Sequence, residues 1–388
     1  MMSLVKWKNI YLSFFIFFIL MSTIFCGVSR VNISFHVALS LFLLTLIFSA
    51  QARNQFLQDK TYLYALVTVA AFVIYYSLSN LWSTSPHLSS SLTHSFYLLV
   101  LMALYRQAEL AGYKKYVITA AWLGTIILAV LTLALVDKSH IFHSRLRDGF
   151  PWSPDNVIDL GGYMALGILF SVLLVREFKS LWFLVPIPLL LLCLILTQSR
   201  GPLMALVAAS VVTAVLRPKW NIKLLAAILL LIIAAVGLLY VSGFLDTFIN
   251  RIDSSYQQSF IRFGIWEHAY DVAMQKPIFG WGFEKELAFV NSIGQHVTTT
   301  HSLYFAALLK GGIVGFILFV SVIGLALWRC KEHFVRNQKA EVAIWLFSLI
   351  FYVTQGMFII SNPREYWVLF WLPLIIAMST PVSKSAQR

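Results

Sequence analysis

The sequence predicts an all-α, polytopic integral membrane protein with about twelve transmembrane helices and a helical outer loop. Of the 388 residues, 60% are hydrophobic and only 12% are charged. Many stretches reach the roughly 20 apolar residues that are needed to cross a bilayer. The expected spans are residues 9–27, 32–50, 61–79, 90–105, 116–136, 157–175, 181–197, 202–216, 222–243, 301–328, 340–360 and 365–380.

The distribution of positive charge predicts the orientation of these spans. Most of the 29 Lys and Arg residues fall in segments on the same side as the N-terminus, which places both termini in the cytoplasm. Lys6 and Lys8 precede the first apolar run, as in a signal peptide, but no small-residue cleavage site follows, so we expect an uncleaved helix. The net charge of +13 is explained by loops that meet anionic membrane lipids, and we infer no nucleic-acid partner.

No internal repeat or appended soluble domain is visible, so we expect one transmembrane domain over residues 1–388. Its larger outer loop should be periplasmic and cover residues 244–300, and the smaller one residues 137–156. In the larger loop, Ser254 and Gln257 can cap a helix that ends at Pro277. The expected apolar stripe of this helix, suited to lie on the membrane surface or on the bundle, consists of Phe263, Trp266, Tyr270 and Ala273. Within the span at 301–328, Gly311 and Gly312 should separate a short first helix from a spanning helix.

The arginines expected on the outer side are not accompanied by a matching set of acidic residues. They are Arg145, Arg147, Arg200 and Arg262. A planar guanidinium donates paired hydrogen bonds to phosphoryl oxygens, so these residues favour a lipid-linked phosphate or pyrophosphate ligand. The alternative for Arg200, which lies in a very short turn between two spans, is an arginine that extends toward the lipid headgroups.

His301 follows three threonines and opens a membrane span. A helix N-terminus disfavours the imidazolium form, so a neutral, proton-accepting ring is plausible there. The alternative is an interfacial histidine with a structural role. A metal site built on His296 and His301 lacks further Cys or carboxylate ligands. Because the three cysteines form no Cys-x-x-Cys pair, we expect neither a metal nor another cofactor.

Five short motifs, taken in their order and spacing, resemble the O-antigen ligase superfamily of multi-span membrane glycosyltransferases. The similarity extends over nearly the whole chain and implies a GT-C-like architecture. It departs from the family pattern at Pro154-Asp-Asn156, where relatives have Asn-Pro-Asn, and at Ser302, where relatives commonly have Asn. The motifs are Thr-Gln-Ser-Arg200-Gly-Pro, Arg262-x3-Trp266, Pro277-x2-Gly280-x-Gly282, His301-x2-Tyr304 and Lys310-Gly-Gly-Ile-Val-Gly315.

The resemblance implies an inverting, metal-independent transfer of O-antigen polysaccharide from undecaprenyl pyrophosphate to a lipid A-core sugar hydroxyl. The reaction would occur on the periplasmic side of the bacterial inner membrane. By the same resemblance, Arg200 and Arg262 would hold the donor pyrophosphate, Arg147 would be a weaker third contact, and His301 would activate the acceptor hydroxyl.

Three other functions remain open at the level of sequence. An O-antigen polymerase and a protein O-oligosaccharyltransferase use the same lipid-linked donor and differ only in the acceptor. A transporter of lipid-linked sugars would instead need polar or broken helices near the bilayer midplane.

Overall fold

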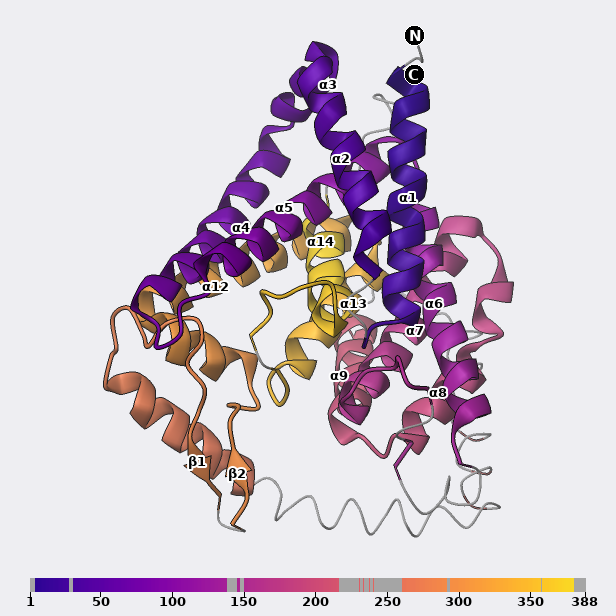
Figure 1. Ribbon diagram of the computed structural model, residues 1–388. Coiled ribbons are helices and arrows are strands. Elements are labelled where there is room, and N and C mark those ends of the chain that lie inside the picture. The colour runs from indigo at the N-terminus through magenta and orange to yellow at the C-terminus, as the bar shows by residue number, and fades with distance from the viewer. Residues whose placement is uncertain are drawn as a thin grey trace.

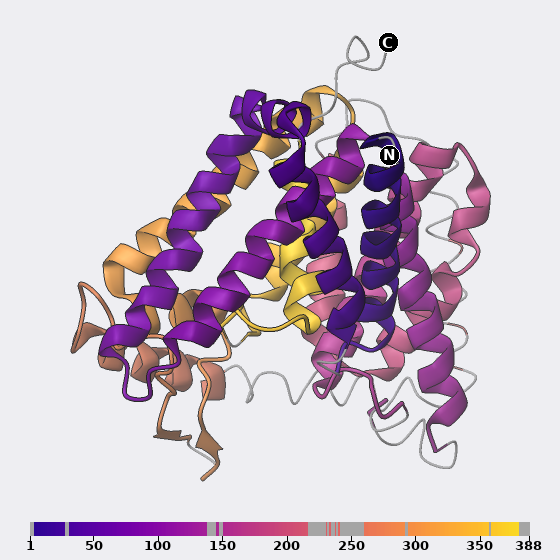
Figure 2. The same ribbon diagram turned by 45° about the horizontal axis from the view of Figure 1, so that its top comes forward.

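The structure, a computed structural model, describes residues 4–27, 31–137, 145–146, 150–215, 260–291, 294–356 and 358–379, together with residues 230, 233, 237 and 240. These residues form a bundle of helices with one short β-hairpin at its edge, as two views of the molecule show (Figure 1 and Figure 2). The labelled α-helices are α1 (Leu4–Ile24), α2 (Asn32–Phe48), α3 (Ala50–Gln58), α4 (Lys60–Leu78), α5 (Leu88–Leu110), α6 (Lys114–Leu135), α7 (Val157–Phe178), α8 (Ile187–Leu196), α9 (Arg200–Val215), α12 (Leu303–Val335), α13 (Lys339–Phe351) and α14 (Leu372–Met378).

The remaining elements are short or lie in the outer loops. A further helix covers residues 260–274. The antiparallel strands β1 and β2 cover Phe289–Val290 and His296–Val297. The 3-10 helices are η2 (Ser79–Trp82) and η3 (Leu181–Leu184), and a π-helix, η4 (Trp367–Trp371), precedes α14.

The structure confirms an all-α membrane protein but not the number of twelve spans. Six of the described helices are long and apolar enough to cross a membrane, or seven if α2 and α3, which meet at 101°, form one broken span. The segments predicted at 181–197, 202–216 and 365–380 form shorter apolar helices. The predicted span at 222–243 lies outside the described residues except for four positions.

Ion pairs gather several helix ends at one end of the bundle. Arg106 at the end of α5 contacts Asp59 before α4 at 2.5 Å. Glu341 at the start of α13 is fully buried and contacts Lys114 at 3.1 Å and Arg176 at 2.6 Å. Buried charges are costly unless they are paired. The segments joined in this way are among those predicted to be cytoplasmic.

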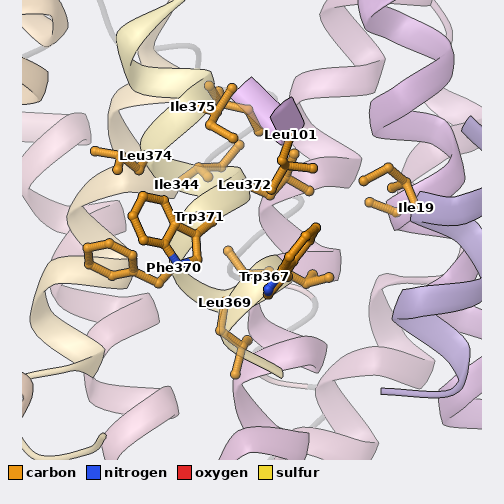
Figure 3. Packing of buried hydrophobic residues seen from close by; sticks show 14 of the residues in the cluster. Ile19, Leu101, Ile344, Trp367, Leu369, Phe370, Trp371, Leu372, Leu374 and Ile375 are labelled. Atoms are coloured by element: carbon orange, nitrogen blue, oxygen red, sulfur yellow. The ribbon is translucent and has the colours of Figure 1, made fainter. Parts of the chain in front are cut away.

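The C-terminal helix occupies the centre of the hydrophobic core. Figure 3 shows side chains of η4 and α14 among Ile19 of α1, Leu101 of α5 and Ile344 of α13. Trp371 is completely buried and Trp367 is 2% exposed. Because closely packed cores tolerate little displacement, the position of η4 fixes the position of the loop that precedes it.

The outer-loop helix packs on the bundle through only part of the predicted stripe. Ile265, Ala269 and Ala273 form the buried face of helix 260–274, whereas Phe263 is 58% exposed and Tyr270 is 49% exposed. The buried residues pack in one cluster with the first turns of α12. Small alanines permit this close approach, so the partner helix, and not the largest aromatic side chains, determines which face is buried.

Candidate functional site

The long helix α12 is broken where the two glycines predict it. Gly312 has φ 59° and ψ −162°, which is not helical. The backbone groups released by the break bond to the Pro-x-x-Gly-x-Gly segment: Ile313 N donates to Pro277 O at 2.7 Å, and Gly282 N donates to Lys310 O at 2.9 Å. Unsatisfied backbone groups are costly at membrane depth. The two motifs therefore form one structural unit.

Glycine is required at the contact between these two motifs. Gly280 has φ 69°, and a Cβ atom there would overlap the backbone of Gly312 and Lys310. A positive φ and the lack of space both exclude larger residues. This contact holds the segment 277–282 against the first half of α12 and so fixes the surroundings of the residues just before that helix.

His301 lies immediately before α12 in a strained backbone conformation. Its φ is 47°, a left-handed value that is uncommon for residues other than glycine and that often occurs at functional sites. The chain on either side is held by hydrogen bonds. Leu303 N bonds to Tyr352 O and Gln355 O, each at 3.1 Å, and Thr300 Oγ1 donates to Ser302 O at 2.7 Å. The backbone on both sides of the half-buried His301 is thus fixed.

Arg262 is brought to His301 by the packing of helix 260–274 on α12. Trp266 stacks on Phe305 with ring centroids 5.7 Å apart. Burial, and in second place the Arg262 charge, lowers the pKa of His301 below its ordinary 6.5. Burial also lowers the pKa of Arg262. Among the described residues, no hydrogen-bond or ion-pair partner contacts the guanidinium of Arg262. The site therefore joins a neutral imidazole to a cation with available donors.

A cavity of about 500 Å³ opens beside His301. Its walls come from three parts of the chain. They are the residues around the start of α7, the outer loop together with the first turns of α12, and the loop after α13. Neither Arg200 nor Arg262 is among the described residues that line it. Its charged lining residues are Asp155, Asp159, Glu284, Lys285, Glu286, Lys310, Arg364 and Glu365.

Arg200 begins α9 after a turn that a second arginine holds in place. Arg145 Nε donates to Thr197 O at 3.1 Å and its Nη2 donates to Ser199 Oγ at 2.8 Å. Arg145 therefore has a structural contact of its own, and Arg200 is also partnered. Arg147 lies outside the described residues.

The start of α9 and the start of α12, which follows His301, lie against the same loop, residues 352–356. A Cβ atom at Gly201, next to Arg200, would lie 3.4 Å from Thr354 Oγ1. The neighbouring carbonyls of Tyr352 and Gln355 accept the hydrogen bonds from Leu303. Arg200 thus lies at the same end of the bundle as His301 and Arg262, although it is not part of the cavity wall.

Comparison with known proteins shows which family this chain is similar to. A family profile described as O-Antigen ligase matches residues 183–320, a range that contains Arg200, Arg262 and His301. The chain is also 28% identical over 344 residues to a Pseudomonas aeruginosa protein named O-antigen ligase, covering 80% of this chain and 76% of that relative. The chain is similar to the O-antigen ligase family over these ranges. The resemblance inferred from the motifs is confirmed, and the similarity supports a membrane O-antigen ligase-type activity.

Three cavity residues, Asp159, Gln355 and Glu365, were not singled out from the sequence. One signal was present, because Asp159 is an ionisable residue inside an expected span, and such residues are costly and usually functional. No comparable signal marked Gln355 or Glu365, since both lie at the ends of predicted spans where polar residues are ordinary.

Proposed function

We propose that this protein transfers O-antigen polysaccharide from undecaprenyl pyrophosphate to a sugar hydroxyl of lipid A-core. The transfer takes place at the periplasmic face of the bacterial inner membrane, with both termini in the cytoplasm. The observation that supports this proposal most strongly is the neutral imidazole of His301, held in a strained conformation beside a cavity and next to Arg262. An acceptor hydroxyl needs a positioned base of this kind.

His301 acts as the general base in the proposed reaction. The imidazole takes the proton of the acceptor hydroxyl as its oxygen forms a bond to the anomeric carbon of the donor. The bond between that carbon and the pyrophosphate oxygen breaks, and undecaprenyl pyrophosphate leaves with the electron pair. Attack from the side opposite to the leaving group inverts the anomeric configuration.

The arginines stabilise the leaving group. Negative charge develops on the pyrophosphate as the bond breaks, and fixed cationic donors at that place lower the barrier. Arg262 has its donors available beside His301, and Arg200 lies at the same end of the bundle. Arg147 contributes more weakly. Their combined charge takes the place that a divalent cation has in other pyrophosphate-dependent transferases.

The broken helix α12 raises the question of transport, because broken helices at the midplane form the ion sites of many transporters. In such sites the released backbone groups coordinate the ion. Here they are used within the protein, by the segment 277–282 and by Tyr75, whose hydroxyl donates to Gly311 O at 2.7 Å. The break therefore favours a rigid scaffold for His301 over a transport pathway.

Purified protein should transfer glycan to lipid A-core in detergent without ATP or an ion gradient, and should do so in excess EDTA. The assay contains the lipid-linked donor and measures the acceptor glycan on gels over time. Extension of a second lipid-linked glycan in place of lipid A-core would identify a polymerase. Loss of activity in chelator that only magnesium or manganese restores would show that a metal ion supplies the charge assigned to the arginines.

A further inference from the structure

Three polar side chains in the cavity beside His301 have no role in the transfer step described above. Asp159 comes from α7, Gln355 from the loop after α13, and Glu365 from the residues just before η4. All three line the same cavity as His301. These three side chains come from distant parts of the chain and line one cavity, which is the arrangement expected of a ligand-binding site.

Two of these side chains are buried, and the third is half-buried. Gln355 is 3% exposed and Glu365 is 7% exposed, and Asp159 is half-buried. Within the part of the chain that the structure describes, the Gln355 amide and the Asp159 carboxylate have no hydrogen-bond partner, and the Glu365 carboxylate accepts from its own backbone N–H. Buried polar groups are nearly always hydrogen-bonded. A bound molecule with hydrogen-bond donors would complete this set.

The loop that positions two of them is firmly anchored. The indole nitrogen of Trp371 donates to Ile359 O at 2.8 Å, and that of Trp367 donates to Ser361 O at 3.0 Å. Gln355 O accepts from Leu303 N, two residues after His301. Side chains fixed by a surrounding shell in this way are suited to hold a ligand in one orientation.

The remaining lining residues narrow the class of ligand. Phe283, Phe358 and Tyr366 supply aromatic surface in the same cavity. A pyranose ring has an apolar C–H face, which packs on an aromatic ring, and a rim of hydroxyl groups, which donate to carboxylates. Carboxyl groups are suitable hydrogen-bond partners for such hydroxyls, whereas Arg200 and Arg262, the residues assigned to the pyrophosphate, are not part of this cavity wall. In the described residues no group of His, Cys, Asp or Glu is arranged to bind a metal ion.

We propose that Asp159, Gln355 and Glu365 form the subsite that binds the acceptor sugar and holds its hydroxyl at His301. The hydroxyls adjacent to the reacting one donate to the two carboxylates, and the Gln355 amide both donates and accepts. This inference rests on the proposed function. It assigns the cavity to the acceptor, and it assigns Arg200 and Arg262, which do not line the cavity, to the donor.

The test is a steady-state analysis of Asp159→Asn, Gln355→Ala and Glu365→Gln in the full-length protein. The KM for lipid A-core and the KM for the lipid-linked donor are measured separately. Loss of a hydrogen bond to a charged group should raise the acceptor KM about tenfold or more in each variant. The donor KM and the thermal unfolding temperature should stay close to wild type. Asp271→Asn is the matched control, because Asp271 is exposed on helix 260–274 and does not line the cavity, and its acceptor KM should not change.

The outcomes separate this inference from the proposed function. Absence of any transfer to lipid A-core by the wild type would refute the function. Normal wild-type transfer with an unchanged acceptor KM in all folded variants would refute the subsite alone. A raised donor KM with an unchanged acceptor KM would also overturn the inference, because it would show that the cavity binds the donor glycan. Three independent positions keep the test decisive if one variant fails to fold.

Discussion

His301→Ala should lower kcat for glycan transfer by at least about a hundredfold, because a positioned general base contributes on the order of 10² to 10⁴ in rate. The donor KM should change little, since the proposed pyrophosphate contacts come from arginines. His301→Gln should fail equally, because the amide can preserve local hydrogen bonds but cannot accept the proton. Acceptor-glycan formation is followed over time at matched protein concentration.

His296→Ala is the internal control for this experiment. His296 lies five residues earlier in the chain, in strand β2, and its side chain is exposed, so the variant should retain most of its activity. Near-normal turnover by His301→Gln would show that the imidazole has a structural role and that another group is the base.

Arg200→Ala and Arg262→Ala should each reduce transfer by roughly 10² to 10³, the usual cost of removing one donor that stabilises developing charge. Lysine should restore activity poorly at either position, because an ammonium group cannot form the paired hydrogen bonds of a guanidinium. Arg147→Ala should have a smaller effect. The measurements are the transfer rate and the amount of protein in the membrane.

Arg53→Ala removes the same charge from α3, at the end of the bundle predicted to be cytoplasmic. Within the described part of the chain, the Arg53 guanidinium bonds to two helix carbonyls, Leu46 O and Ile47 O, so its loss should leave the rate unchanged. Full ligation by both Arg200→Ala and Arg262→Ala at normal protein levels would refute the proposed pyrophosphate contacts.

The sequence predicted those parts of the site that depend on local chemistry. Glycines at 311 and 312 indicated a broken helix, and the structure places the break at Gly312. Clustered motifs indicated that Arg262 and His301 belong together, and their electrostatic interaction agrees with this. In both cases a special backbone conformation or a charge at the membrane edge leaves a visible signal in the residue type.

Features that depend on packing partners could not be predicted in the same way. Which face of helix 260–274 is buried depends on the shape of α12, so Ile265, Ala269 and Ala273 are buried in place of the larger aromatic side chains. The apolar segment predicted as one span at 181–197 is divided between η3 and the ten-residue helix α8. Composition measures apolar character but not where a helix ends.

The cavity wall illustrates a third limit. Asp159 and Glu365 are far apart along the chain and meet only because η4 and α7 are neighbours in the folded bundle. Nothing in the residues around either position specifies this meeting. Long-range contacts of this kind decide which polar side chains face His301, and they require the structure.

The pH dependence of kcat/KM tests most directly the claim that a neutral, buried His301 is the base. Burial and the Arg262 charge lower the pKa of His301, so the base should be available above that pKa, and activity should fall only as pH drops through a value below 6.5. In Arg262→Gln the residual activity should show this acidic limb at higher pH, and in His301→Gln the limb should disappear. A wild-type limb above pH 6.5, or a limb that persists unchanged in His301→Gln, would contradict the account.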